Sequence, residues 1–110
     1  MRKSKSGKSV EVYILTVHVG RKEGDGLPKA ATGAALLCYA SGVSEDEAVR
    51  ETVAVLKQAD MAPLEVESLG ARSEVFGDKA QADDAEAALM QRALDENAVI
   101  VAQVEVLSER

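Results

Sequence analysis

Three segments of the chain, 10–19, 33–41 and 98–107, are apolar at consecutive positions rather than at alternate ones. In the first, the odd positions hold Tyr13, Leu15, Val17 and Val19, and the even ones hold Val10, Val12 and Ile14 before Thr16 and His18. A strand with one face in water alternates apolar and polar residues. The three runs therefore predict strands of a sheet whose two faces are both covered.

Two further segments have the signals of helices. Ser44 and Glu47 have the spacing of a capping box, which predicts that a helix begins there, and Pro63 predicts that it ends near Asp60. The second helix is expected from Asp83 to Asn97. Acidic residues fill its first turn, and Asn97 is a residue type that ends helices in the left-handed conformation.

The remaining segments have weaker patterns. Residues 64–69 alternate as a short strand, and Gly70 then permits a reversal into a second short strand, 72–76. An alternative omits the 72–76 strand. Residues 20–32 are rich in glycine and charge and predict a loop, longer than an ordinary hairpin connection, that forms either a lid over a pocket or a floppy tip.

From residue 33 onward the expected order is strand, helix, strand, strand, helix, strand, the split βαβ plan of a ferredoxin-like fold, preceded by one extra strand. The prediction is a single α+β domain over residues 10–110, a two-layer sandwich with an antiparallel-rich sheet. Both helices are expected on one face, because successive crossovers share a handedness.

Two helices cover one face of a four-stranded sheet and leave the other bare. We therefore expect a homodimer that packs sheet against sheet through that face. The alternatives are that the 20–32 loop folds over the face or that a different protein covers it.

Charge is distributed unevenly along the chain. The formal net charge is −6, yet residues 1–9 hold four of the 13 basic residues and none of the 19 acidic ones. This composition predicts a flexible basic tail, 1–9, on an acidic body that repels nucleic acid and anionic lipid. No apolar run approaches the ~18 residues of a membrane span, and no secretory signal is apparent, so the cytoplasm is the expected location.

Candidate chemistry begins with the single histidine and the single cysteine. If the first two strands form a hairpin with arms of equal length, Thr16 lies opposite Cys38 and His18 opposite Leu36. His18 and Cys38 would then be diagonal neighbours on one face, as in a thiolate–imidazole pair. Metal sites usually need three or four protein ligands, so we expect neither a metal nor a cofactor.

Two tyrosines complete the candidate set. Tyr13 and Tyr39 could line a pocket between the sheet and the 20–32 loop, or belong to the core or to a subunit interface. The candidate ligand-binding residues are thus His18, Tyr13, Cys38 and Tyr39.

Two functions remain open. The first is a small non-enzymatic dimeric binding or regulatory module, because the sequence offers no convergent set of reactive side chains. Its partner would be a small molecule or a protein. The alternative is a small cofactor-less enzyme whose pocket lies between the sheet and the 20–32 loop, with His18 as acid or base beside Tyr39 or Cys38.

Overall fold

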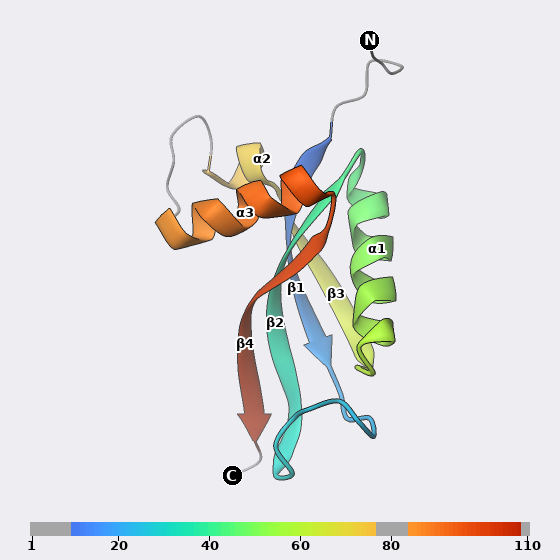
Figure 1. Cartoon of the computed structure of the whole chain (residues 1–110). Coiled ribbons are helices and arrows are strands. Elements are labelled where there is room, and N and C mark those ends of the chain that lie inside the picture. Colours follow the sequence, from blue (N-terminus) through green and yellow to red (C-terminus); the bar gives the residue numbers. More distant parts are fainter. Residues whose placement is uncertain (1–9, 77–83, 109–110) are drawn as a thin grey trace.

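A four-stranded sheet organises the chain, and the computed structural model describes residues 10–76 and 84–108. The elements are β1 (Glu11–Val19), β2 (Ala31–Gly42), α1 (Glu45–Gln58), β3 (Pro63–Ala71), α2 (Arg72–Phe76), α3 (Asp84–Glu96) and β4 (Val99–Ser108) (Figure 1). The strand order is β3-β1-β2-β4, and every neighbouring pair is antiparallel. The predicted α+β class and antiparallel sheet are confirmed, whereas the predicted tail, 1–9, lies outside the described residues.

Local signals set the ends of both long helices. The Ser44 hydroxyl accepts the Glu47 amide at 3.2 Å, and the Glu47 carboxylate accepts the Val43 amide at 2.8 Å, so the capping box that begins α1 is confirmed. Asp60 and Asn97 follow the two helices with φ of 63° and 51°. Among the described residues, no helix is both long and apolar enough to cross a membrane.

The predicted strand 72–76 is wrong, because this segment is the short helix α2. Gly70 turns the chain with φ of 117°, and the Glu74 carboxylate then accepts the Ala71 amide at 2.9 Å. This hydrogen bond between residues three apart holds a helical turn and is incompatible with an extended strand. The alternative that omits the strand agrees with the observed order of strands.

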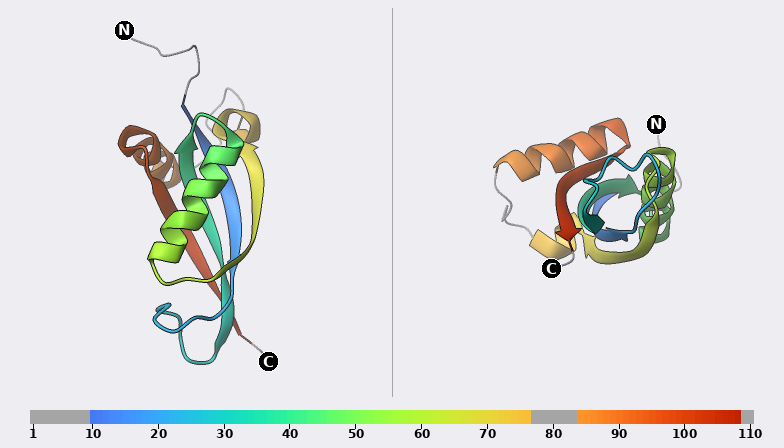
Figure 2. Two further views of the ribbon diagram at one scale, coloured as in Figure 1. Left: turned by 90° about the vertical axis from the view of Figure 1, so that its right-hand side faces the viewer. Right: turned by 90° about the horizontal axis from the view of Figure 1, so that it is seen from below.

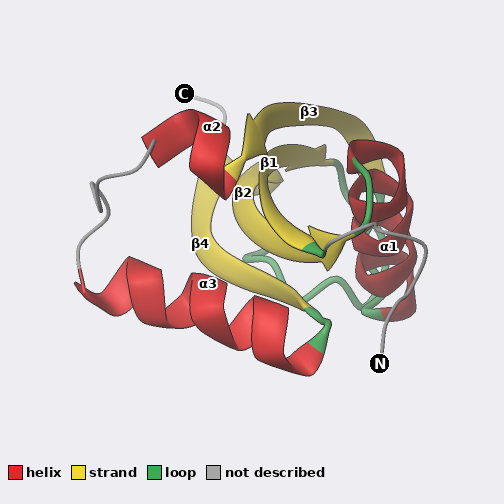
Figure 3. Cartoon of the chain, turned by 90° about the horizontal axis from the view of Figure 1, so that it is seen from above, coloured by secondary structure: helices red, strands yellow, loops and turns green. Residues whose placement is uncertain are grey.

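The two long helices lie on opposite sides of the sheet, as Figure 3 shows. Leu36 of β2 packs in one cluster with Leu56 of α1, whereas Ile14 of β1 packs in another with Met90 of α3. We name the two surfaces the α1 face, with the odd positions of β1 and the even positions of β2, and the α3 face, with the opposite set. The expectation of both helices on one face is therefore wrong.

Strand direction explains the arrangement. β2 and β3 both run antiparallel to β1, so β2–α1–β3 joins parallel strands and is the kind of connection that the handedness rule for crossovers governs. β4 runs antiparallel to β2 and hence to β3, so that rule does not govern the second connection. This connection links opposite edges of the sheet, and α3 crosses the strands near the beginning of β1 (Figure 1). The ferredoxin-like plan is not confirmed.

The apolar pattern on both sides of the central strands now has a cause within one chain. α1 covers the buried side chains of the α1 face, and α3 covers Val12, Ile14 and Tyr39 on the other. The premise of a sheet-to-sheet dimer, a wholly bare second face, is therefore wrong. Among the described residues, no helix covers the half of the α3 face beyond α3.

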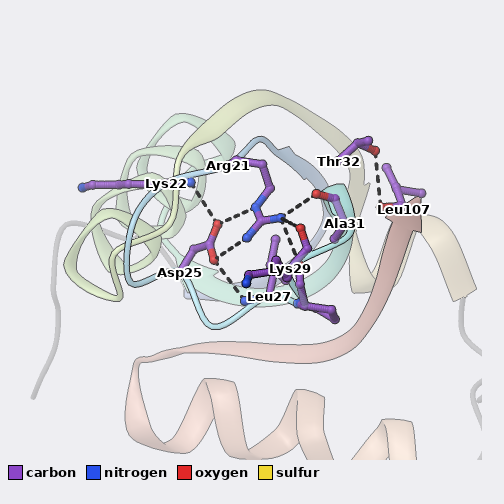
Figure 4. A network of polar contacts seen from close by, with 9 residues as sticks. Arg21, Lys22, Asp25, Leu27, Lys29, Ala31, Thr32 and Leu107 are labelled. Atoms are coloured by element: carbon purple, nitrogen blue, oxygen red, sulfur yellow. Dashed lines mark hydrogen bonds and ion pairs between the residues drawn. The ribbon is translucent and has the colours of Figure 1, made fainter. Parts of the chain in front are cut away.

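The connection between β1 and β2 is a closed loop, at the end of the sheet where β1 stops (Figure 2). Asp25, only 6% exposed, accepts hydrogen bonds from the Arg21 guanidinium at 3.0 Å and from the amides of Lys22 and Leu27 at 2.9 and 3.0 Å (Figure 4). These bonds, that from Arg21 above all, lower the pKa of Asp25 to about 2. Gly24 and Gly26 supply the positive φ angles that the turn needs.

The loop contributes to the core on the α1 face. Leu27 packs against the cluster that contains Val17, Leu36 and Leu56. Arg21 also donates to the carbonyls of Pro28 and Ala31, which holds the loop closed at the start of β2. The loop thus closes one end of the α1 face, rather than covering the α3 face as one alternative supposed.

Candidate functional site

The predicted pairing of His18 with Cys38 is wrong, because the register of the hairpin differs by one residue. Cys38 lies opposite Leu15, and His18 lies opposite Ala35. A shift of one residue moves a side chain to the other face of a sheet. His18 therefore lies on the α3 face and Cys38 on the α1 face, and the two side chains cannot act together.

Cys38 is part of the packed core under α1. Its side chain is fully buried with Leu36 and Leu56, and this burial raises the pKa of the thiol to about 11. The thiolate is the form that attacks electrophiles and binds metals, and burial suppresses it. The geometry assigns Cys38 a packing role.

The two tyrosines are also separated by the sheet. Tyr39 is buried on the α3 face, and its hydroxyl donates to the Glu86 carboxylate at 3.3 Å. Tyr13 is half-buried on the α1 face; desolvation, followed by the charges of Glu11, Glu74 and Glu45, raises its pKa. The four candidate residues thus do not converge on one pocket.

A different group of side chains converges on the part of the α3 face that α3 leaves uncovered, which we name the open face. It consists of two rows that cross all four strands in the order β3, β1, β2, β4. The rows are Glu67, Thr16, Leu37 and Gln103, and Glu65, His18, Ala35 and Glu105. Of the four predicted residues, only His18 belongs to this group.

The open face is hollowed on both sides of its centre. A hollow of about 150 Å³ lies toward β3 and a second of about 270 Å³ toward β4, and Thr16 and Ala35 line both of them. The small side chain of Ala35 lies between the larger His18 and Glu105 of its row. The floor of the open face, formed by Thr16, Ala35 and Leu37, is therefore uncharged. Longer polar side chains on β3 and β4 form its two walls.

The charge of the open face is negative. Glu65 and Glu67 project from β3, and Glu105 projects from β4. His18 is exposed, and no member of the two rows forms an ion pair with another described residue. Carboxylates on both sides of an uncharged floor favour a cationic ligand.

Gln103 borders the open face where α3 begins to cover the sheet. Its amide donates to the Glu86 carboxylate at 3.4 Å, and the same carboxylate group accepts the Tyr39 hydroxyl. These contacts fix the boundary between the covered half of the α3 face and the open half.

The sequence contains a weak signal for this site. Thr16 and His18 interrupt the first apolar run, and Gln103 and Glu105 interrupt the last. Polar residues two positions apart on two strands indicate solvent on one face of both. Recognising that they share a face requires the pairing of β1, β2 and β4, which local patterns do not supply.

A further hollow, of about 320 Å³, lies between α1 and the start of β4. Among the side chains that line it, the Ser41 hydroxyl donates to the side-chain oxygen Oδ1 of Asn97 at 2.7 Å, and the Glu47 carboxylate accepts the Val43 amide. These groups hold the turn before β4 and the beginning of α1. Their hydrogen bonds are therefore explained by the fold without a ligand.

Metal binding finds no support in the part of the chain that the structure describes. No group of three or more histidine, cysteine, aspartate or glutamate side chains lies close enough there to hold an ion. The carboxylates of the open face are spread over both outer strands, which suits contacts with separate positive charges.

Comparison with known proteins gives the chain a family and no function. No curated protein and no solved structure matches it. A family model matches residues 12–108, from the second residue of β1 to the end of β4. The chain therefore belongs to the family described as a domain of unknown function, DUF8846.

Proposed function

We propose that the chain is a small non-enzymatic binding module, dimeric and regulatory in character, whose open face binds a basic segment of a partner protein. One observation carries this proposal: carboxylates on β3 and β4 flank an uncharged floor in a part of the α3 face that no described helix covers. Such a surface attracts lysine and arginine side chains.

The size of the hollows favours a protein segment over a small molecule. Pockets that enclose a drug-sized ligand have volumes of roughly 300–1,000 Å³. The two hollows of the open face, about 150 and 270 Å³, are smaller and lie side by side on a sheet. Each suits one side chain of an extended segment that crosses the strands.

The separation of the reactive side chains favours binding over catalysis. Cys38 is buried on one face and His18 is exposed on the other, and the two tyrosines are similarly divided. Acid–base catalysis needs groups that converge on one substrate atom. A free, buried cysteine also suits a reducing compartment, so we place the protein in the cytoplasm.

The alternative remains a cofactor-less enzyme that uses His18. Its support is that His18 lies opposite Glu65 on the neighbouring strand and lines the hollow of about 150 Å³ with it. A histidine beside a carboxylate is a common acid–base arrangement. The open face has no wall that would exclude water from a reaction, so binding is the better-supported function.

The test is a titration of the ¹⁵N-labelled full chain with a short peptide of alternating arginine and serine, followed by NMR. We expect chemical-shift changes at Thr16, Ala35 and Gln103, and none with a peptide of alternating glutamine and serine. The double variant Glu65→Gln with Glu105→Gln should weaken binding about tenfold, or 1.4 kcal/mol. The matched control is Glu23→Gln with Glu51→Gln, which removes two exposed charges outside the two rows.

Two results would contradict the proposal. One is equal weakening by the two double variants, which would indicate attraction to net charge alone. The other is a titration without shifts on the open face. If instead His18→Gln abolished turnover of a substrate while leaving peptide binding intact, the enzymatic alternative would replace it.

A further inference from the structure

β4 is the outermost strand on its side of the sheet. It is ten residues long, and only its inner edge pairs with a described strand, β2. An outer edge of this kind presents backbone N–H and C=O groups that another strand can pair with.

The same strand also exposes apolar side chains. Val101, Val104 and Val106 are 38%, 52% and 41% exposed. They lie opposite Cys38, Leu36 and Ala34 of β2, on the α1 face. The apolar rows of the core therefore continue outward to the edge and end in water there, because α1 lies toward β3 and only Val99 of β4 joins the packed clusters beneath it.

From these two features we infer that two copies of the chain pair edge to edge through β4, antiparallel about a twofold axis, to form one continuous eight-stranded sheet. An exposed apolar row on a long, unpaired outer strand marks a pairing surface in a natural domain. Antiparallel pairing of two identical strands brings the same surface together from both copies, so the assembly closes as a dimer.

Charge selects the register of the pairing. If Val104 lies opposite the partner's Val104, Gln103 of one copy lies opposite the partner's Glu105, which allows an amide–carboxylate hydrogen bond. If the axis passes instead through Glu105, two carboxylates meet directly, which destabilises a strand pair. The pairing is therefore centred on Val104, where the valine rows of both copies form one apolar strip.

The size of the contact sets its strength. A ten-residue strand is roughly 33 Å long, and a single strand edge with one valine row buries less than the ~800 Å² per partner of a standard interface. We therefore expect dissociation in the micromolar range rather than an obligate dimer. The two α3 faces lie on the same side of the joined sheet, so the open faces become neighbours, although the pairing does not depend on what they bind.

Sedimentation equilibrium of the full chain, from below one micromolar to several hundred micromolar, tests the inference. We expect a monomer–dimer equilibrium in the wild type, and dimerisation at least about 30-fold weaker in Val104→Lys, since the lysine would be buried against its copy. Leu64→Lys is the matched control, because Leu64 is 72% exposed on the opposite edge, β3. This control should dimerise as the wild type does, and urea unfolding shows whether both variants are folded.

Cross-linking supplies a second measurement that does not require a lysine at the interface. Val104→Cys places a thiol on the twofold axis, at a strand-pair distance that suits a disulfide. Under mild oxidation we expect a covalent dimer from Val104→Cys and monomer from Leu64→Cys.

Three results would overturn the inference. They are a monomer throughout the concentration range, a dimer that Val104→Lys leaves intact, and equal cross-linking of the two cysteine variants. The second would move the interface to another surface, and the first would leave the β4 edge to a different protein.

Discussion

The two edges of the sheet differ in how they are protected. β3 begins with Pro63, carries Glu65 and Glu67, and has two irregularities in its pairing with β1. β4 also has two irregularities, in its pairing with β2, but it has a single carboxylate, Glu105, no proline, and three exposed valines on one side. Proline, charge and bulges are the devices by which natural sheets prevent pairing at an edge.

The difference shows where the chain avoids a neighbour and where it can accept one. α1 lies over the β3 side of the sheet, so the protected edge is also the one whose inward residues are best covered. On the α1 face, the β4 side is not covered by α1, and its valines stay exposed. A single chain thus separates one closed edge from one open edge, and each can be altered independently.

The largest effect on stability should come from weakening the packing of α3 beneath the β4 side of the sheet. Met90 is fully buried against Val12, Ile14 and Tyr39, and α3 is the helix that holds the β4 side of the sheet. Met90→Ala should cost about 2–5 kcal/mol of unfolding free energy in urea. Hydrogen exchange should rise more at β4 amides than at β3 amides, and equal loss of protection at both strands would contradict this asymmetry.

Removing the protection of β3 should create a second open edge. The double variant Glu65→Val with Glu67→Val leaves the protein with two unprotected strands, so species larger than a dimer should form at high concentration. Sedimentation velocity would detect them, with self-association at least about tenfold stronger than in the wild type. Glu23→Val with Glu51→Val is the control, and the prediction fails if both pairs behave alike.

Acid should destabilise the loop between β1 and β2, and with it the contacts that this end of the sheet makes with β3 and β4. The Gly20 amide of the loop donates to the carbonyl of Ala62, the residue before β3, at 2.9 Å, and the hydroxyl of Thr32, the second residue of β2, donates to the Leu107 carbonyl of β4 at 3.3 Å. The pKa of Asp25 is about 2 in the folded chain, below the ~3.9 of an unfolded aspartate. The stability from this carboxylate is therefore complete above about pH 4 and is lost as the pH falls toward 2.

Thermal melting between pH 6 and about pH 2 measures this effect. Asp25→Asn should lower Tm by several degrees at pH 6 and should flatten the decline between about pH 4 and 2. Glu23→Gln, an exposed carboxylate on the same loop, should leave the profile unchanged. An unchanged profile in Asp25→Asn would mean that other carboxylates govern acid unfolding.

The smallest effect on stability should come from an exposed ion pair on α3, away from both edges of the sheet. Arg92 and Glu96 form an exposed ion pair at 3.1 Å along α3. Arg92→Gln should cost about 0.3–0.5 kcal/mol in urea, with no change in self-association. A change in dimerisation would show that α3 takes part in the contact between copies.

Local patterns predicted the elements better than their arrangement. The Ser44 capping box, Pro63 and Asn97 act through residues within one turn, so the boundaries of α1 and α3 followed from the sequence. The register did not, because no local signal fixes which residues pair: Val19 lies opposite Ala34, and residues 31–33 extend β2 along β4 alone. The site was missed for the same reason, since its rows exist only once four strands are aligned.

The placement of Cys38 makes the opening of the core measurable. This single thiol is fully buried between α1 and the middle of the sheet, so a thiol reagent reaches it only when α1 lifts away or the domain unfolds. Its labelling rate under native conditions therefore counts opening events. The molecule thus contains one natural reporter of how often its core is exposed, without any engineered label.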